Sequence, residues 1–160
     1  MNLAANAPYW LIGILFTLLL LATLEDGWRL RISNILPLGV AAAGIIAILM
    51  VGLSASIWQN ALLFAVTLLV GSLAFGARLL GGGDVKLLAA CMIWFDLRSG
   101  WQLVVAIAIA GGLLAIVILA ARQFTRGLRD SRWIVLRPKG GIPYGIAIGF
   151  GTAFMVAAQR

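Results

Sequence analysis

Residues 102–121 read QLVVAIAIAGGLLAIVILAA, twenty positions without a charged side chain. A helix of this length and composition matches the hydrocarbon core of a bilayer, which requires about 20 apolar residues. The rest of the chain has a similar character, because 63% of its 160 residues are hydrophobic and only 11% are charged. A soluble domain of this size cannot bury that much apolar surface. The sequence therefore predicts an integral membrane protein.

Five further apolar segments accompany this one along the chain. Together they predict a polytopic, all-α membrane helix bundle with about six transmembrane helices, in a single domain that covers residues 1–160. The fourth segment is short and carries Asp84 and Lys86 in its first turn. The expected spans are Pro8–Leu24, Ile35–Leu53, Ile57–Leu80, Gly83–Phe95, Gln102–Ala121 and Ile142–Ala158.

Basic residues are concentrated in alternate loops. Ten of the twelve Lys and Arg residues lie after the first and fifth spans or around the connection from the third to the fourth, which leaves Arg98 and Arg160 for the other side. Because loops rich in Lys and Arg stay in the cytoplasm, both termini are expected outside. The net charge of +7 is interpreted as membrane topology, and no nucleic acid partner is expected. The basic stretch Arg122–Gly141 is expected to lie on an anionic membrane surface or to form a solvated loop.

The chain has no histidine and one cysteine, Cys91, which is expected to be a core residue. These numbers argue against the usual zinc protease ligands, a Ser–His dyad, a Cys–His pair and an internal disulfide. We expect neither a metal nor another cofactor. Asp96, beside Arg98 at the opposite membrane face, and Asp130, among several arginines, have simpler explanations as local charge pairs. Hydrolytic chemistry would depend on the five carboxylates, Glu25, Asp26, Asp84, Asp96 and Asp130.

Asp26 and Asp84 are the carboxylates best placed for chemistry. Asp84 follows Gly81–Gly83 and begins the fourth span, where an ionisable group is costly and therefore a functional candidate. A helix cap at the membrane boundary is the structural alternative for Asp84. Asp26 lies just past the first span, on the same predicted side. Glu25 is adjacent to Asp26, and because neighbouring helix positions differ by about 100°, only one of the two is expected to face inward.

Two carboxylates held close together provide a way to cleave an amide without a metal ion or histidine. Because like charges at short distance cannot both ionise easily, such a pair shares one proton. One carboxylate then removes a proton from water, while the other donates its proton to the carbonyl oxygen of the substrate. The positions of Asp26 and Asp84 therefore indicate a possible hydrolase.

Three segments of the chain carry recognisable motifs. Gly81–Leu87 reads GGGDVKL and is similar to a GxGDxKL signature. Asp26–Asn34 reads DGWRLRISN and is similar to an Asp followed by basic residues and Ile-Pro-Asn, with Ser33 in the position of the proline. Ile142–Ile148 reads IPYGIAI and resembles an IPYG stretch that opens a last helix. In this order, the motifs resemble those of the type IV prepilin peptidases, which are GxGD aspartyl peptidases.

This resemblance implies a membrane-embedded aspartic endopeptidase that removes the leader peptide of prepilins, with Asp26 and Asp84 as the catalytic residues. It is closest to the short CpaA/TadV-like form of tight-adherence (Flp) pilus systems. Longer relatives carry a cysteine-bearing domain and also methylate, so no methyltransferase activity is expected here. The implied location is the bacterial inner membrane, with the site toward the cytoplasm and with prepilin and lipids as partners. Roles in binding substrate or shaping the site are implied for Gly81, Gly83, Lys86, Asn34, Pro143 and Tyr144.

Two other functions fit a membrane bundle that bears carboxylates. A small proton-coupled transporter would need a polar path across the membrane, and the second, third and fifth spans supply almost no polar lining. A non-catalytic subunit of a pilus or secretion assembly would tolerate the loss of either aspartate. Activity on a prepilin substrate therefore separates a peptidase from both alternatives.

Overall fold

The computed structural model describes residues 1–124 and 141–160. These residues form helices and no strand, so the predicted all-α bundle is confirmed. Asp130 and nearly all of the basic stretch that was expected on the membrane surface lie outside the described residues. The helices are α1 (Leu3–Asn6), α2 (Tyr9–Arg29), α3 (Ile35–Val51), α4 (Ile57–Gly76), α5 (Gly82–Met92), α6 (Leu97–Phe124) and α7 (Tyr144–Ala158).

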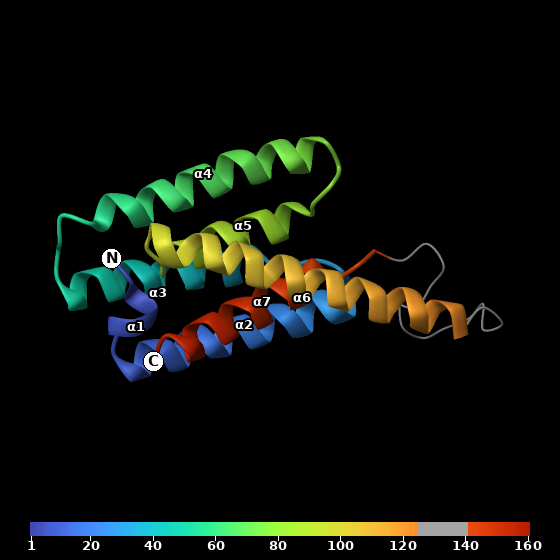
Figure 1. Ribbon diagram of the computed structural model, residues 1–160, viewed down its shortest axis with the longest axis horizontal. Coiled ribbons are helices and arrows are strands. Elements are labelled where there is room, and N and C mark those ends of the chain that lie inside the picture. The colour runs from blue at the N-terminus through green and yellow to red at the C-terminus, as the bar shows by residue number, and fades with distance from the viewer. Residues whose placement is uncertain (125–140) are drawn as a thin grey trace.

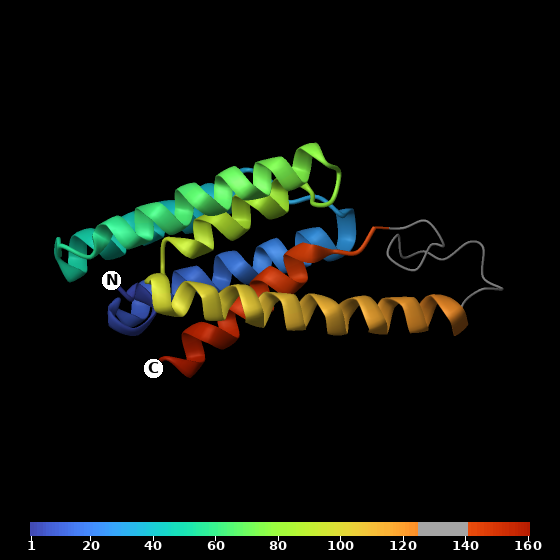
Figure 2. The same ribbon diagram turned by 45° about the horizontal axis from the view of Figure 1, so that its top comes forward.

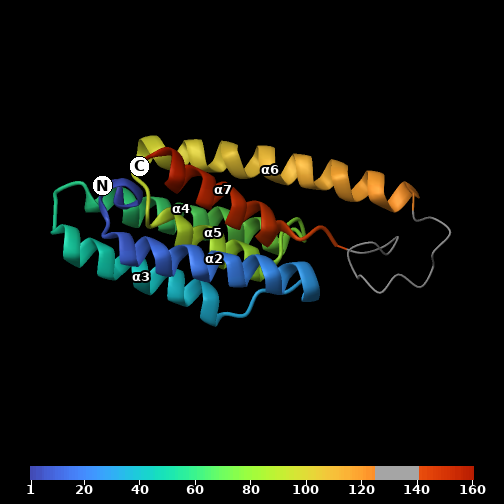
Figure 3. The ribbon, with the colours of Figure 1, turned by 90° about the horizontal axis from the view of Figure 1, so that it is seen from below.

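Helices α2 to α7 run roughly along one axis and alternate in direction (Figures 1 and 2). Both termini lie at one end of the bundle, while α2, α4 and α6 finish at the other end, where α3, α5 and α7 begin. Helix α5 packs on α3, α4 and α7, and α2 packs on α3 and α7 (Figure 3). Helix α6 packs mainly on α7 and extends beyond its neighbours. The alternating order therefore brings the start of α5 and the end of α2 to one end of the bundle.

The six expected spans are found as α2 to α7, but several of their ends differ from the prediction. Among the described helices, α2, α4 and α6 are long and apolar enough to cross a membrane, while α3 and α7 are shorter apolar helices. Helix α2 continues to Arg29 and does not end near Leu24, so Asp26 lies within the helix. The chain turns at Leu30, which has a φ of 52° and donates its N–H to the Asp26 carbonyl oxygen at 2.9 Å.

Helix α5 is shorter than a transmembrane helix but lies in the core. Its 11 residues span about 17 Å at 1.5 Å per residue, against a hydrocarbon core of about 30 Å. Leu87, Cys91 and the following Trp94 are fully buried, as expected for Cys91. Gly71 of α4 allows a close approach, because a Cβ atom there would lie 2.6 Å from a methyl carbon of Val85. Helices α3, α4 and α7 therefore cover much of α5.

The carbonyl groups just beyond α5 receive hydrogen bonds from other segments. Asn60 of α4 is buried and donates its side-chain amide to the carbonyl oxygens of Ile93 at 2.8 Å and Phe95 at 3.0 Å. The carbonyl oxygen of Trp94 accepts two backbone N–H groups from α1, each at 3.0 Å. An apolar environment requires such partners, because a buried backbone group without one is costly. Asn60 and α1 thus allow α5 to end inside the bundle.

Replacing Asn60 with alanine is expected to destabilise the fold. The change would remove the partners of two buried carbonyl groups, at a cost of about 1–3 kcal/mol for each. Thermal unfolding of detergent-purified protein should therefore show a clearly lower Tm for Asn60→Ala. The control is Asn6→Ala, which removes one exposed hydrogen bond and should leave the Tm nearly unchanged. Equal Tm values for both variants would contradict this role of Asn60.

Candidate active site

The two aspartates selected from the sequence meet at the end of the bundle opposite the termini. Asp26 comes from the last turn of α2, and Asp84 comes from the first turn of α5. Both line one cavity of about 270 Å³. The other residues lining this cavity, called the polar cavity below, are Leu30, Arg31, Ile32, Gly81, Gly82 and Gly83.

Asp26 also contacts the beginning of α7. Its side chain is only 4% exposed, and Oδ2 accepts the backbone N–H of Gly145 at 2.7 Å. Pro143 is the N-cap residue of α7, so Gly145 lies in the first turn, where backbone N–H groups have no partner within the helix. A carboxylate is favoured there by the free N–H groups and by the helix dipole. The contact therefore holds the Asp26 carboxylate between α2 and α7.

Gly145 was not among the residues expected at the site, although it belongs to the same IPYG motif as Pro143 and Tyr144. A Cβ atom at Gly145 would lie 2.8 Å from Oδ2 of Asp26 and 2.7 Å from Cδ1 of Ile32. Only glycine fits here without displacing one of these groups. The IPYG motif indicated this segment in the sequence. The neighbour that requires glycine at position 145 is Asp26, which lies 119 positions earlier in the chain, so its contact with Gly145 could be found only in the structure.

The glycines before Asp84 allow the two halves of the site to approach each other. A Cβ atom at Gly81 would lie 2.7 Å from Oδ2 of Asp84. At Gly83 it would lie 3.0 Å from Cβ and 3.2 Å from the carbonyl oxygen of Ile32, in the loop after Asp26. Gly81 and Gly83 thus lie where the resemblance placed them, and their roles in shaping the site stay predictions.

Lys86 and Asn34 contact each other but not the aspartates. Nζ of Lys86 donates to Oδ1 of Asn34 at 2.8 Å, and both side chains are exposed. This hydrogen bond links the start of α5 to the residue that precedes α3. Neither residue lines the polar cavity. The structure therefore places both at the edge of the site, where they connect the segments that carry it.

Glu25 points away from the polar cavity, as expected for the neighbour of Asp26. Its Oε2 accepts the backbone N–H of Ser33 at 2.9 Å, and its Oε1 lies 3.9 Å from Nη1 of Arg29. Ser33 occupies the position where the resembling motif has proline, and proline has no N–H to donate. The hydrogen bond to Glu25 therefore depends on this departure from the motif and helps to fix the loop between α2 and α3.

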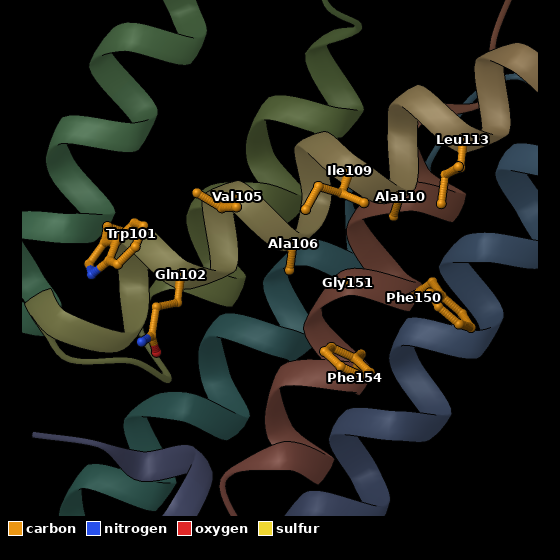
Figure 4. Close-up of a pocket in the computed structure, with 10 residues that line it drawn as sticks. All are labelled: Trp101, Gln102, Val105, Ala106, Ile109, Ala110, Leu113, Phe150, Gly151 and Phe154. Atoms are coloured by element: carbon orange, nitrogen blue, oxygen red, sulfur yellow. The ribbon is translucent and has the colours of Figure 1, made fainter.

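Among the apolar cavities of the described residues, two are lined by residues of both α6 and α7. One, of about 310 Å³, is lined by Asp84, Tyr144 and apolar residues of α5, α6 and α7. The other, of about 440 Å³, lies between α6 and α7 and contains no titratable residue (Figure 4). Its lining includes Trp101, Phe150 and Phe154. The second cavity is larger, but its lining offers no titratable group.

The remaining described carboxylate, Asp96, lies at the end of the bundle that holds the termini. The expected pairing with Arg98 was wrong in detail, because Oδ1 of Asp96 accepts the backbone N–H of Ser99 at 2.8 Å and so caps α6. The described residues contain no group of three or more His, Cys, Asp or Glu side chains that could hold a metal ion. Asp26 and Asp84 therefore remain as the candidate catalytic groups within residues 1–124 and 141–160.

Residues 13–120 match the type IV leader peptidase family, over more than half of the chain. The chain belongs to the type IV leader peptidase family. A leader peptidase is a hydrolase that acts on prepilins, and the apolar helices agree with an integral membrane protein. The match includes Asp26 and Asp84 but ends before α7, so the contribution of Gly145 rests on the structure. Searches of curated proteins and of solved structures gave no match.

Proposed function

We propose that this leader peptidase is an aspartic endopeptidase in which Asp26 and Asp84 form the catalytic pair. The main support is their convergence, because side chains from two helices that are remote in sequence line the same small cavity. Each side chain also lies at a helix N-terminus, Asp84 in the first turn of α5 and Asp26 against the first turn of α7. The hydrogen bond from Gly145 would position the Asp26 carboxylate before substrate arrives.

The pair would act on a peptide bond through one bound water molecule. One carboxylate accepts a proton as the water oxygen attacks the carbonyl carbon, and the other, protonated, aspartate donates its proton to the carbonyl oxygen. When the tetrahedral intermediate collapses, the C–N bond breaks. The leaving amine takes the proton that was removed from water, and the hydroxyl proton of the intermediate returns to the second carboxylate. The pair therefore ends with the same number of protons as it began with.

The proposed substrate is a prepilin of the tight-adherence (Flp) type, cleaved at the cytoplasmic face of a bacterial inner membrane. Arg29, Arg31, Arg78 and Lys86 lie in or beside the connections at the end of the bundle that holds the site. Under the positive-inside rule this end faces the cytoplasm and both termini face outward. A leader that stays in the cytoplasm would then reach the aspartates without crossing the membrane. We propose that the whole chain acts as one domain.

A peptidase accounts for the described structure better than a transporter does. Beyond Asp84, the cavities between α6 and α7 and between α5 and α6 are lined almost entirely by apolar side chains. They provide no chain of polar groups for an ion, which an ion pathway through a membrane requires. The alternative of a non-catalytic assembly subunit predicts an inactive purified protein, and this can be tested directly.

Purified protein in lipid nanodiscs is expected to cleave an Flp-type prepilin without another protein. Mass spectrometry should detect the free leader and the mature pilin, with cleavage retained in EDTA because carboxylates and water carry the reaction. In the presence of S-adenosylmethionine the new pilin N-terminus should stay unmethylated, since the 160 residues contain a single cysteine and so cannot supply paired cysteines. An intact prepilin after incubation with correctly folded protein would overturn the proposal.

A further inference from the structure

The cavity of about 310 Å³ that lies beside Asp84, called the apolar cleft below, differs in character from the polar cavity. Apart from Asp84 and Tyr144, the described residues lining it are aliphatic residues or glycines, including Leu88, Ile107 and Ile148. The polar cavity instead contains two carboxylates, Arg31 and three glycines. Asp84 lines both cavities. A peptide bond held at this carboxylate would therefore have a polar environment on one side and an apolar one on the other.

The apolar cleft is bounded by α5, α6 and α7. Helix α6 packs extensively on α7 but hardly touches α5. The cleft therefore lies between α5 and α6, and α7 contacts both of these helices. Tyr144, at the beginning of α7, lies at the same end of the cleft as Asp84, because α5 and α7 begin at the same end of the bundle. The cleft thus begins beside Asp84 and continues past the first turns of α5 and α7.

We propose that the apolar cleft binds the first residues of the mature pilin, which follow the cleaved bond and carry apolar side chains. This inference rests on the proposed function, in which the leader stays in the cytoplasm, so that a substrate segment entering the membrane after the cleaved bond has to be apolar. The leader side then occupies the polar cavity, and the mature side enters the apolar cleft. Burial of an apolar side chain there would favour binding, because apolar surface is removed from water.

The size of the apolar cleft restricts the conformation of the bound segment. The apolar cleft has a volume of about 310 Å³, and its lining comes from α6, the first turn of α7, and the start of α5 with the residues before it. One or two apolar side chains of an extended segment fit this volume. We therefore expect the cleft to take the side chains that lie directly beside the cleaved bond.

Gly112 of α6 provides a way to fill the apolar cleft without disturbing the packing of helices. It lines the cleft, and a Cβ atom built on it would have no other atom within 4 Å. Gly13 of α2 also has no atom within 4 Å of such a Cβ and does not line the cleft. Gly112→Leu and Gly13→Leu are therefore matched changes, both in exposed positions of long apolar helices.

The test compares cleavage of two prepilins, one with a large apolar residue directly after the bond and one with alanine there. For the prepilin with the large apolar residue, Gly112→Leu is expected to lower kcat/KM by roughly 10–200-fold. For the prepilin with alanine, the same variant should keep most of the wild-type kcat/KM. Gly13→Leu should cleave both prepilins as the wild-type protein does. Equal kcat/KM values for Gly112→Leu and Gly13→Leu, or an equal loss on both prepilins, would overturn the inference.

A cross-linking experiment tests the occupant of the apolar cleft without requiring activity. Photoreactive benzoylphenylalanine is placed at position 112 or at position 13 in an Asp84→Asn background, with prepilin and lipid present. We expect position 112 to cross-link to the first mature residues of the prepilin and position 13 to give no such product. Cross-links from position 112 to lipid alone would show an acyl-chain site and overturn the inference. A wild-type protein that binds prepilin there but never cleaves it would instead refute the proposed function.

Discussion

Asp84→Asn is expected to lower the rate of leader cleavage by roughly 10²–10⁴-fold, the usual contribution of a general acid or base. Asparagine has nearly the same shape but can neither accept a proton from water nor share one with Asp26. Asp26→Asn should cause a loss of the same size, because the amide oxygen can still accept the Gly145 N–H while the acid–base function is gone. The double variant should be little worse than either single one, since groups that act as a unit are not additive.

Co-expression with an Flp-type prepilin provides the measurement, with leader removal followed by the change in mobility on a gel. Asp96→Asn is the matched control, because Asp96 caps α6 at the opposite end of the bundle and should not affect catalysis. All variants should be present in the membrane at similar levels. Cleavage at the wild-type rate by either Asp26→Asn or Asp84→Asn would exclude the catalytic pair and favour a different role in pilus assembly.

Gly145→Ala is expected to produce the second large loss, roughly 10²-fold in kcat, although it removes no catalytic group. The added methyl group would lie 2.8 Å from Oδ2 of Asp26 and 2.7 Å from Cδ1 of Ile32, so the carboxylate, the loop or α7 must move. A displacement of about 1 Å at a reacting group can cost this much in rate. The effect should therefore appear in kcat, because the position of Asp26 changes and the apolar cleft does not.

Gly13→Ala is the control for this change, because the same methyl group at Gly13 meets no atom within 4 Å. Single-turnover cleavage in nanodiscs separates the chemical step from the binding of prepilin. Normal single-turnover rates for Gly145→Ala would show that the contact between Asp26 and α7 has no part in positioning the carboxylate.

Apolar segments and short sequence motifs predicted the fold class of the protein. The uncharged run that became α6 and the other long apolar segments were sufficient for an all-α bundle, because segments of this hydropathy have few alternatives to a membrane helix. The alternating direction of successive spans also placed Asp26 and Asp84 at one end, as the structure does. These predictions depend on length and order along the chain, which the sequence contains directly.

Other features depend on contacts between distant segments. Helix α5 ends early because Asn60 and α1 supply hydrogen bonds to the carbonyl groups beyond it, and no local pattern marks Asn60 as their partner. Asp26 lies within α2 because that helix continues alongside α7, whereas hydropathy alone placed its end near Leu24. Gly145 acquires its importance only from the approach of Asp26.

Ser33 illustrates how a departure from a motif can be understood from the structure. Judged by sequence, serine in place of proline only leaves the loop after Asp26 less restricted. In the fold, the N–H of Ser33 donates to the carboxylate of Glu25. Helix geometry predicted that Glu25 and Asp26 point in different directions, but it did not predict that Ser33 is the partner of Glu25. A hydrogen bond thus restrains the loop where proline would restrain it through its ring.

Cysteine cross-linking in membranes tests most directly whether the two aspartates meet. Asp26→Cys and Asp84→Cys are combined in a Cys91→Ala background and treated with the shortest bifunctional methanethiosulfonate reagent. Mass spectrometry should find a link between positions 26 and 84. The pair Asp26→Cys with Asp96→Cys, separated by the length of α5 or about 17 Å, should give none. A link from position 26 to position 96 but not to position 84 would contradict the proposed catalytic pair.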